Sequence, residues 1–206
     1  MQDFNWKQLQ NGSDLRGVAL PGVEHEPINL TPEIANRLGK TFASWLGRKM
    51  SKPVSDLVIS VGRDSRLSGP ALMQAISEGI AACGCRVYDF GMASTPAMFM
   101  STITPEFNCD GAIMITASHL PFNRNGFKFF TAQGGLEKQN ISDILGLAEQ
   151  NNVADGFGQG QVESHDFISV YADQLVQTIR KAVNNLESFE QPLKGLKIVV
   201  DAGNGA

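Results

Sequence analysis

The stretch AIMITASHLP, residues 112–121, joins an apolar run to a polar loop. The apolar part, residues 112–115, has the length and composition of a buried strand. The loop that follows carries the hydroxyl of Ser118 beside the imidazole of His119, and the ammonium of Lys128 comes shortly afterwards. In open α/β sheets ligands collect at the carboxyl ends of strands, and loops on a rigid scaffold carry much of the chemistry. We therefore expect a functional site in this loop.

Strands and helices alternate on both sides of this segment. Helices are expected to begin at Thr31, Ser68 and Thr95, because a proline lies within the next two positions of each. Strands are expected at residues 57–61, 86–90, 112–115 and 127–131. Two further apolar periodicities predict helices at 141–148 and 167–186, separated by a surface loop at 151–161. This order predicts an α/β fold, a three-layer α/β/α domain with a mixed, mostly parallel sheet.

The C-terminal segment has the pattern of another α/β unit. Residues 186–195 are expected to form a linker, and KIVVD at 197–201 a buried strand that leads into the glycine turn AGNG. We expect one domain over residues 1–188, and a linker with the first strand of a truncated second domain over 189–206. On this interpretation the sequence is a fragment.

Composition excludes several classes of protein. Of the 206 residues 42% are hydrophobic and 18% are charged, as in globular proteins. A net charge of −4 gives no reason to expect a nucleic-acid partner. No apolar run approaches the ~20 residues of a membrane span, and no signal peptide is visible, so we expect a cytoplasmic protein without a membrane partner. The odd cysteine count, with Cys83, Cys85 and Cys109, predicts buried thiols rather than disulfides or a zinc site.

The candidate residues allow structural as well as functional interpretations. Ser118 is of a type that forms turns, while Lys128 and Arg16 could be solvated surface charges. In a functional interpretation, Lys128 binds phosphate or acts as a base, and Arg16 offers a bidentate donor to phosphate. Neighbouring side chains on an extended segment point in opposite directions. Ser118 and His119 are therefore expected to line a curved loop around an anion rather than to form a proton relay.

Two neighbouring segments complete this expectation. GRDSR at 62–66 follows a strand end and should lie on the same rim as Ser118. The structural alternative is that Arg63 pairs internally with Asp64 or with other loop groups. Asn125-Gly126 is a turn signal, so a turn is expected there. The nucleophile elbow G-x-S-x-G and the phosphate loop GxxxxGK[ST] are both absent, and the three histidines are not at metal-ligand spacing.

Four segments resemble motifs of one family. TASHLP at 116–121, followed by NGFK at 125–128, resembles the phosphoserine loop of the α-D-phosphohexomutases. GRDSR at 62–66 and DLRG at 14–17 are similar to two further family motifs, and VDAGNG at 200–205 resembles the opening strand of the family's second domain. The resemblance runs over nearly the whole chain. Leu120 stands where many members have asparagine, which leaves the subclass open.

The resemblance implies an isomerase that interconverts hexose 1-phosphate and hexose 6-phosphate, as a phosphomannomutase or phosphoglucomutase does. Ser118 would carry a phosphoryl group, donate it to give a hexose 1,6-bisphosphate, and then accept the other phosphate. Mg²⁺ would bind the phosphate on Ser118 together with aspartates beyond Ala206. His119 and Lys128 would act as acid, base or charge stabiliser, and Arg16 would position the reacting groups.

Several alternatives remain at this stage. The family's metal, sugar and distal phosphate loops would lie beyond Ala206, so the 206 residues alone are expected to be inactive. The sugar is not determined. One competing hypothesis is a non-catalytic module that binds phosphosugars or a partner. Another is a serine hydrolase that uses Ser118 and His119, but that chemistry needs an acid partner and an oxyanion hole, which the sequence does not indicate.

Overall fold

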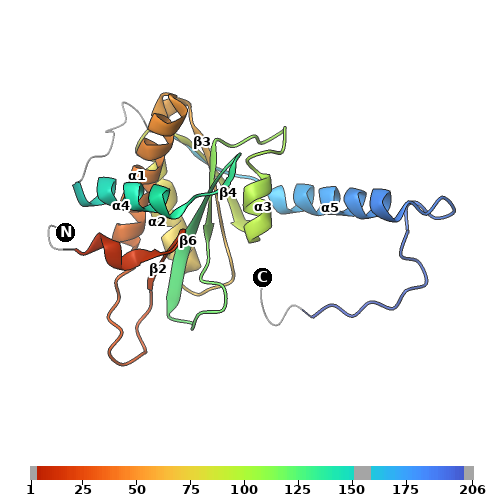
Figure 1. The fold of residues 1–206 in the computed structure, drawn as a ribbon, viewed down its shortest axis with the longest axis horizontal. Helices are drawn as coiled ribbons and strands as arrows, with labels where there is room; N and C mark the ends of the chain where they lie inside the picture. The colour runs from red at the N-terminus through yellow and green to blue at the C-terminus, as the bar shows by residue number, and fades with distance from the viewer. Residues whose placement is uncertain (1–3, 151–158, 202–206) are drawn as a thin grey trace.

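The fold has three layers, with a twisted sheet between two sets of helices (Figure 1). The computed structural model describes residues 4–150 and 159–201. Its helices are α1 (Pro32–Met50), α2 (Gly69–Ala81), α3 (Thr95–Met100), α4 (Lys138–Gln150), α5 (Phe167–Val183) and the short 3₁₀ turns η1 (Trp6–Leu9) and η2 (Val54–Asp56). Its strands are β1 (Gln10–Asn11), β2 (Asp14–Val18), β3 (Val58–Arg63), β4 (Arg86–Met92), β5 (Gly111–Ile115), β6 (Arg124–Thr131), β7 (Gly134–Gly135) and β8 (Val162–Ser164). The predicted α/β/α architecture is confirmed.

The sheet is mixed, with its two halves built differently. The strand order is β1-β2-β6-β5-β3-β4-β8, and β7 pairs with β6. Among the described residues three pairings are parallel, all within β5-β3-β4-β8, and four are antiparallel, so the sheet is mixed as predicted but not mostly parallel. The antiparallel half arises because β6 returns directly alongside β5, and β2 then pairs with the far edge of β6.

Alternation along β5 divides the core into two. Ile113 and Ile115 face the core formed with α1, α2 and α4, whereas Ala112 and Met114 face the smaller core formed with α3 and the start of α5. Successive side chains on a strand point to opposite faces, so a strand covered on both sides is apolar at every position. All of β5 is buried. The carboxyl end of β5 is therefore held from both faces.

The helix starts lie where the sequence predicts them. Thr31 is the N-cap of α1, and its hydroxyl accepts from the backbone N–H of Ile34 at 3.3 Å. Ser94 caps α3 in the same way through the N–H of Ala97. Such caps satisfy N–H groups that have no partner inside the helix.

The cysteines are buried, free thiols, as expected. Burial raises the pKa of Cys85 and of Cys109 to about 12, since a thiolate would lose its hydration there. Both side chains therefore stay protonated and act as small apolar groups.

The C-terminal segments extend away from the three layers (Figure 1). The predicted long helix is present as α5, but only Phe167 in it is buried, and Leu175, Val176 and Ile179 on its surface are exposed. The strand expected at 197–201 is not formed, because none of the described strands pairs with it, and Val199 is 94% exposed. The glycine turn at 202–205 lies outside the described residues. Across the described parts of the chain, no helix combines the length and apolarity that crossing a membrane requires.

Helices α1 and α2 approach so closely that a side chain is excluded at Gly39 and at Gly79. A Cβ at Gly79 would overlap the backbone carbonyl oxygen of Asn36 on α1. The Asn36 amide also donates to the carbonyl of Ala75 at 3.1 Å, which fixes the two backbones at this distance. By contrast, a Cβ at Gly146 in α4 meets no atom within 4 Å.

Gly79 and Gly146 predict opposite effects of alanine. Gly79→Ala should lower the free energy of unfolding by about 1–3 kcal/mol, because the helices must separate to admit the methyl group. Gly146→Ala should raise it by roughly 0.5–1 kcal/mol, because alanine has the higher helix propensity. Urea unfolding of both variants measures the difference, and a Gly79→Ala variant as stable as Gly146→Ala would contradict this packing.

Candidate active site

Two loops meet at the carboxyl ends of neighbouring strands. The segment between β5 and β6, residues 116–123, is called the Ser118 loop here. Arg63 at the end of β3 pairs with Ile115 at the end of β5, and the N–H of Asp64 donates to the carbonyl of Ile115 at 3.0 Å. The segment after β3 therefore lies beside the Ser118 loop on one rim, as the sequence indicates.

The backbone turns sharply at Ser118. Its φ is +54°, in the left-handed region, and its N–H donates to the hydroxyl of Thr116 at 3.0 Å. This turn brings Ser118 Oγ to 3.3 Å from Nδ1 of His119, and both side chains are exposed. The expectation that the adjacent side chains point apart is wrong, because it assumes extended backbone. The pair can exchange a proton, with the direction set by the imidazole tautomer.

Three charged groups lie together on β2 and β6. Lys128 Nζ lies 2.7 Å from both carboxylate oxygens of Asp14, and Arg16 Nη2 donates to Asp14 Oδ2 at 2.9 Å. The Asp14 and Arg16 side chains are only 16% and 11% exposed. Nη1 of Arg16 also donates to the carbonyl of Thr116. Arg16 is thus attached to the first residue of the Ser118 loop, while Lys128 is linked to it through Asp14.

The segment after β3 contributes a further arginine, Arg66, to the rim. Arg63 donates to the backbone carbonyl of Asp64 at 3.0 Å, and the ion pair in this motif joins Asp64 to Arg66, at 3.4 Å. The structural alternative proposed from the sequence, a pair between Arg63 and Asp64, therefore involves a different arginine. The Arg66 guanidinium reaches across to the Ser118 loop.

The turn expected at Asn125-Gly126 is wrong. Both residues lie inside β6 and are buried, with Gly126 opposite Arg16. A Cβ at Gly126 would overlap the carbonyl oxygen of Leu15, so this glycine allows a close strand approach rather than a turn. The Asn125 side chain donates to Ser68 Oγ at 2.8 Å and fastens β6 to the start of α2.

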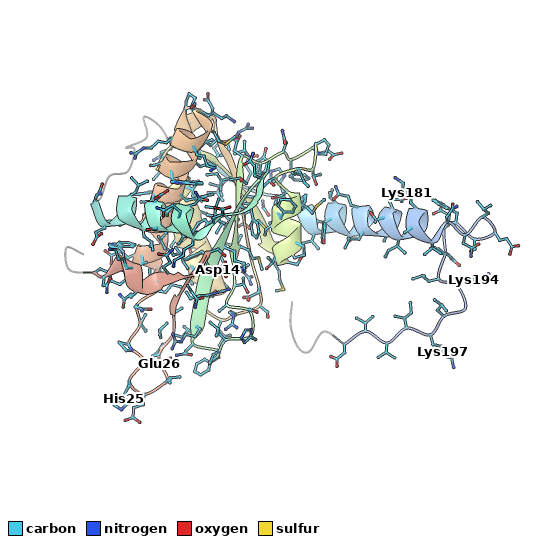
Figure 2. All side chains as sticks on the ribbon, in the orientation of Figure 1. Asp14, His25, Glu26, Lys181, Lys194 and Lys197 are labelled. Atoms are coloured by element: carbon cyan, nitrogen blue, oxygen red, sulfur yellow. The ribbon has the colours of Figure 1, made fainter. Side chains whose placement is uncertain are left out.

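A carboxylate from the segment between β2 and α1 supports the end of the Ser118 loop. Glu26 accepts from Asn123 at 2.7 Å and from Arg124 at 2.6 Å. The hydrogen bond from Asn123, followed by that from Arg124, lowers the pKa of Glu26. Figure 2 shows Glu26 on the loop that extends from the sheet edge, and Asp14 closer to the sheet. Arg124 is therefore paired, not simply an exposed loop charge.

A separate hollow lies at the opposite, amino-terminal ends of these strands. It encloses about 770 Å³ and is bounded by residues that include Lys49, Asp110 and Glu137. Asp110 is occupied there by structural bonds, since it accepts from Lys52 and from the backbone N–H of Val58. The convergent, exposed reactive groups are those around Ser118, so the site is assigned to that rim and not to this hollow.

Comparisons with known proteins assign this domain to a family. Residues 7–153 match the family described as phosphoglucomutase/phosphomannomutase, alpha/beta/alpha domain I. The chain belongs to the phosphoglucomutase/phosphomannomutase family.

Named relatives and a solved structure show the same likeness. The chain is 32% identical to a phosphomannomutase/phosphoglucomutase of Pseudomonas aeruginosa and 37% identical to a phosphoglucosamine mutase of Alkaliphilus metalliredigens, over 94% and 90% of its length. It spans 39% of the length of each. The crystal structure of a family protein from Burkholderia thailandensis superposes with a TM-score of 0.65 and 28% identity, over 82% of this chain and 34% of that one.

Sequence reasoning assigned no role at the site to three residues that shape the rim, Asp14, Arg66 and Ser68. Asp14 lies two positions before Arg16. Side chains two positions apart on a strand lie on the same face, so the strand pattern could have placed Asp14 beside Arg16. Ser68 and Arg66 act through contacts with segments more than 50 residues away. No local pattern reports such contacts.

The Asp14–Lys128 contact predicts energetic coupling between the two side chains. In a double-mutant cycle of Asp14→Asn and Lys128→Met, we expect a coupling free energy of about 1 kcal/mol, because the carboxylate and the ammonium are partly buried and in contact. Urea unfolding measures all four proteins. As a matched control, Asp143→Asn on the exposed surface of α4 should couple to Lys128→Met by less than about 0.5 kcal/mol. Equal coupling in both cycles would contradict the contact.

Proposed function

We propose that this chain carries the phosphoryl-transfer loop of a phosphohexomutase, with Ser118 as the phosphoryl carrier. The observation that carries the proposal is the exposed Ser118 hydroxyl on a left-handed turn, 3.3 Å from an imidazole nitrogen. Cationic side chains lie on the adjoining strands, as a transferring phosphoryl group requires. Membership of the mutase family supports the same reaction class.

The proposed cycle has two transfers. A phosphoryl group on Ser118 passes to a free hydroxyl of a hexose phosphate, giving a hexose 1,6-bisphosphate while the P–O bond to Ser118 breaks. The hydroxyl proton goes to a base on the rim, for which His119 is the candidate, and a proton is returned to the leaving Ser118 oxygen. The bisphosphate then returns its other phosphoryl group to Ser118, and the isomeric monophosphate leaves. The net change is isomerisation, and the enzyme ends phosphorylated as it began.

Lys128 and Arg16 have electrostatic roles in this proposal. Charge on the transferring group spreads over its oxygens, and fixed donors stabilise it without rearrangement. Lys128 on β6 is held by Asp14 on β2, which suits a charge stabiliser. Arg16 bonds to the first residue of the loop, which suits a role in positioning Ser118 as well as the substrate.

The metal requirement is also a proposal. Mg²⁺ prefers oxygen ligands and commonly combines one or two carboxylates with substrate phosphate. Within residues 4–150 and 159–201 no group of three or more His, Cys, Asp or Glu side chains could hold a metal ion. A phosphate on Ser118 would supply one oxygen ligand, and we propose that aspartates outside these 206 residues supply the others.

The substrate and the length of chain needed for activity are also proposals, and the relatives support them. The relatives named above include both a phosphomannomutase/phosphoglucomutase and a phosphoglucosamine mutase, so the hexose phosphate differs among them. We propose a hexose phosphate substrate for this protein, with the cytoplasm as the location of the reaction. The chain spans 39% of these relatives, and we propose that the 206 residues alone do not turn over substrate.

Phosphorylation of Ser118 tests the proposal directly. In the full-length gene product, incubation with glucose 1,6-bisphosphate and Mg²⁺ should place one phosphoryl group on Ser118, detected by phosphopeptide mass analysis. Ser118→Ala should abolish this and lower kcat by several orders of magnitude, because the carrier oxygen is removed. Ser142→Ala, an exposed serine on α4, should change neither. An unmodified Ser118 with full mutase activity would contradict the mechanism and favour a binding module.

A further inference from the structure

The guanidinium of Arg66 is enclosed by backbone carbonyls of the Ser118 loop and the start of β6. Its Nη2 donates to the carbonyls of Ser118 and Leu120, both at 2.7 Å. Its Nη1 donates to the carbonyls of Pro121 and Arg124, at 2.8 and 3.0 Å. The four N–H groups of the two terminal nitrogens thus meet four acceptors on a segment of seven residues.

This arrangement supplies what the loop needs. Ser118 has a positive φ, which is unfavourable for a residue with a side chain and persists only when surrounding contacts impose it. Four carbonyl oxygens directed at one point also repel one another unless a cation lies between them. A planar guanidinium with donors in a fixed fork satisfies both conditions, whereas an ammonium has only three donors and no fork.

Arg66 is itself held by the sheet. Asp64 accepts from the Arg66 backbone N–H at 3.1 Å and lies 3.4 Å from its Nε. The N–H of Asp64 in turn donates to the carbonyl of Ile115, the last residue of β5. The Arg66 side chain is only 13% exposed. A continuous set of contacts therefore leads from the end of β5 through Asp64 and Arg66 to the carbonyl of Ser118.

We propose that Arg66 is a positioning residue for phosphoryl transfer, which fixes the Ser118 hydroxyl by binding the loop backbone and does not itself contact substrate. The inference rests on the proposed role of Ser118. It assigns to Arg66 a role through the loop backbone alone, whereas Arg16 and Lys128 are proposed to act on the transferring group as well. A displacement of a reacting atom by about 1 Å can lower a rate by on the order of 10²-fold, so a loop held less firmly would affect kcat.

Two loop-specific measurements test this inference. Arg66→Lys keeps the charge but removes the fork. It should speed amide hydrogen exchange at least about tenfold at Ser118, Leu120 and Arg124, whose N–H groups are bonded within the loop. Exchange in α1 should stay unchanged. In the full-length gene product kcat should fall on the order of 10²-fold with KM within about threefold, because positioning acts on the transition state.

Rescue separates positioning from general stability. Guanidinium ion at sub-denaturing concentration should restore part of the activity of Arg66→Ala, whereas it should not help Ser118→Ala. Arg86→Lys, at the exposed start of β4 and so at the end of the strands opposite the Ser118 loop, is the matched control and should behave as wild type. Should Arg66→Lys fail to fold, Asp64→Asn removes only the support of Arg66 and should show smaller changes in the same direction.

The outcomes separate this inference from the proposed function. Wild-type exchange and kcat in a folded Arg66→Lys variant would overturn the positioning role. If wild-type Ser118 is never phosphorylated, the proposed function fails on that measurement alone. Faster loop exchange in the variant would then still support Arg66 as the residue that holds the loop, and unchanged exchange would overturn that as well.

Discussion

The antiparallel pairing of β2 with β6 is the contact on which the candidate site depends. It places Arg16 opposite Gly126 and brings Asp14 to Lys128, residues separated by more than 100 positions in the chain. The approach is close enough that only glycine fits at position 126. Without this pairing the Ser118 loop would keep its attachment to β5 and Lys128 its place on β6, but the rim would lose Arg16 and the carboxylate of Asp14 that holds Lys128.

A second requirement is that the loop itself be rigid. A serine with positive φ would relax in an isolated peptide, yet here its carbonyl, its N–H and the residues around it are all bonded. Most of those bonds come from the segment after β3, which the parallel β3–β5 pairing holds in place. The parallel half of the sheet thus determines the loop conformation, and the antiparallel half determines its electrostatic surroundings.

The difference between local and long-range information explains what the sequence predicts. Helices α1, α2 and α3 were predictable because caps and prolines act within one turn, and β5 was predictable because its apolar run needs no partner to be recognised. The turn predicted at Asn125-Gly126 was wrong because pairing with β2 overrides the local turn preference of these residues. The positions of Ser118 and His119 were predictable as a loop, but their 3.3 Å contact depended on a backbone angle that neighbours impose. At residues 197–201 the strand-like pattern is real, but a strand forms only with a partner to share its hydrogen bonds.

The charges on the rim constrain how phosphate can be received. Three cations, Arg16, Lys128 and Arg66, lie with two carboxylates, Asp14 and Asp64, so most of the positive charge is already paired. An ammonium has three donors, and Asp14 can occupy two of those on Lys128, which leaves one for an incoming oxygen. Asp14 therefore holds Lys128 ready at the cost of part of its binding capacity. Such an arrangement suits a group that must be bound, transferred and released, because a fully unpaired cluster of cations would retain the phosphate.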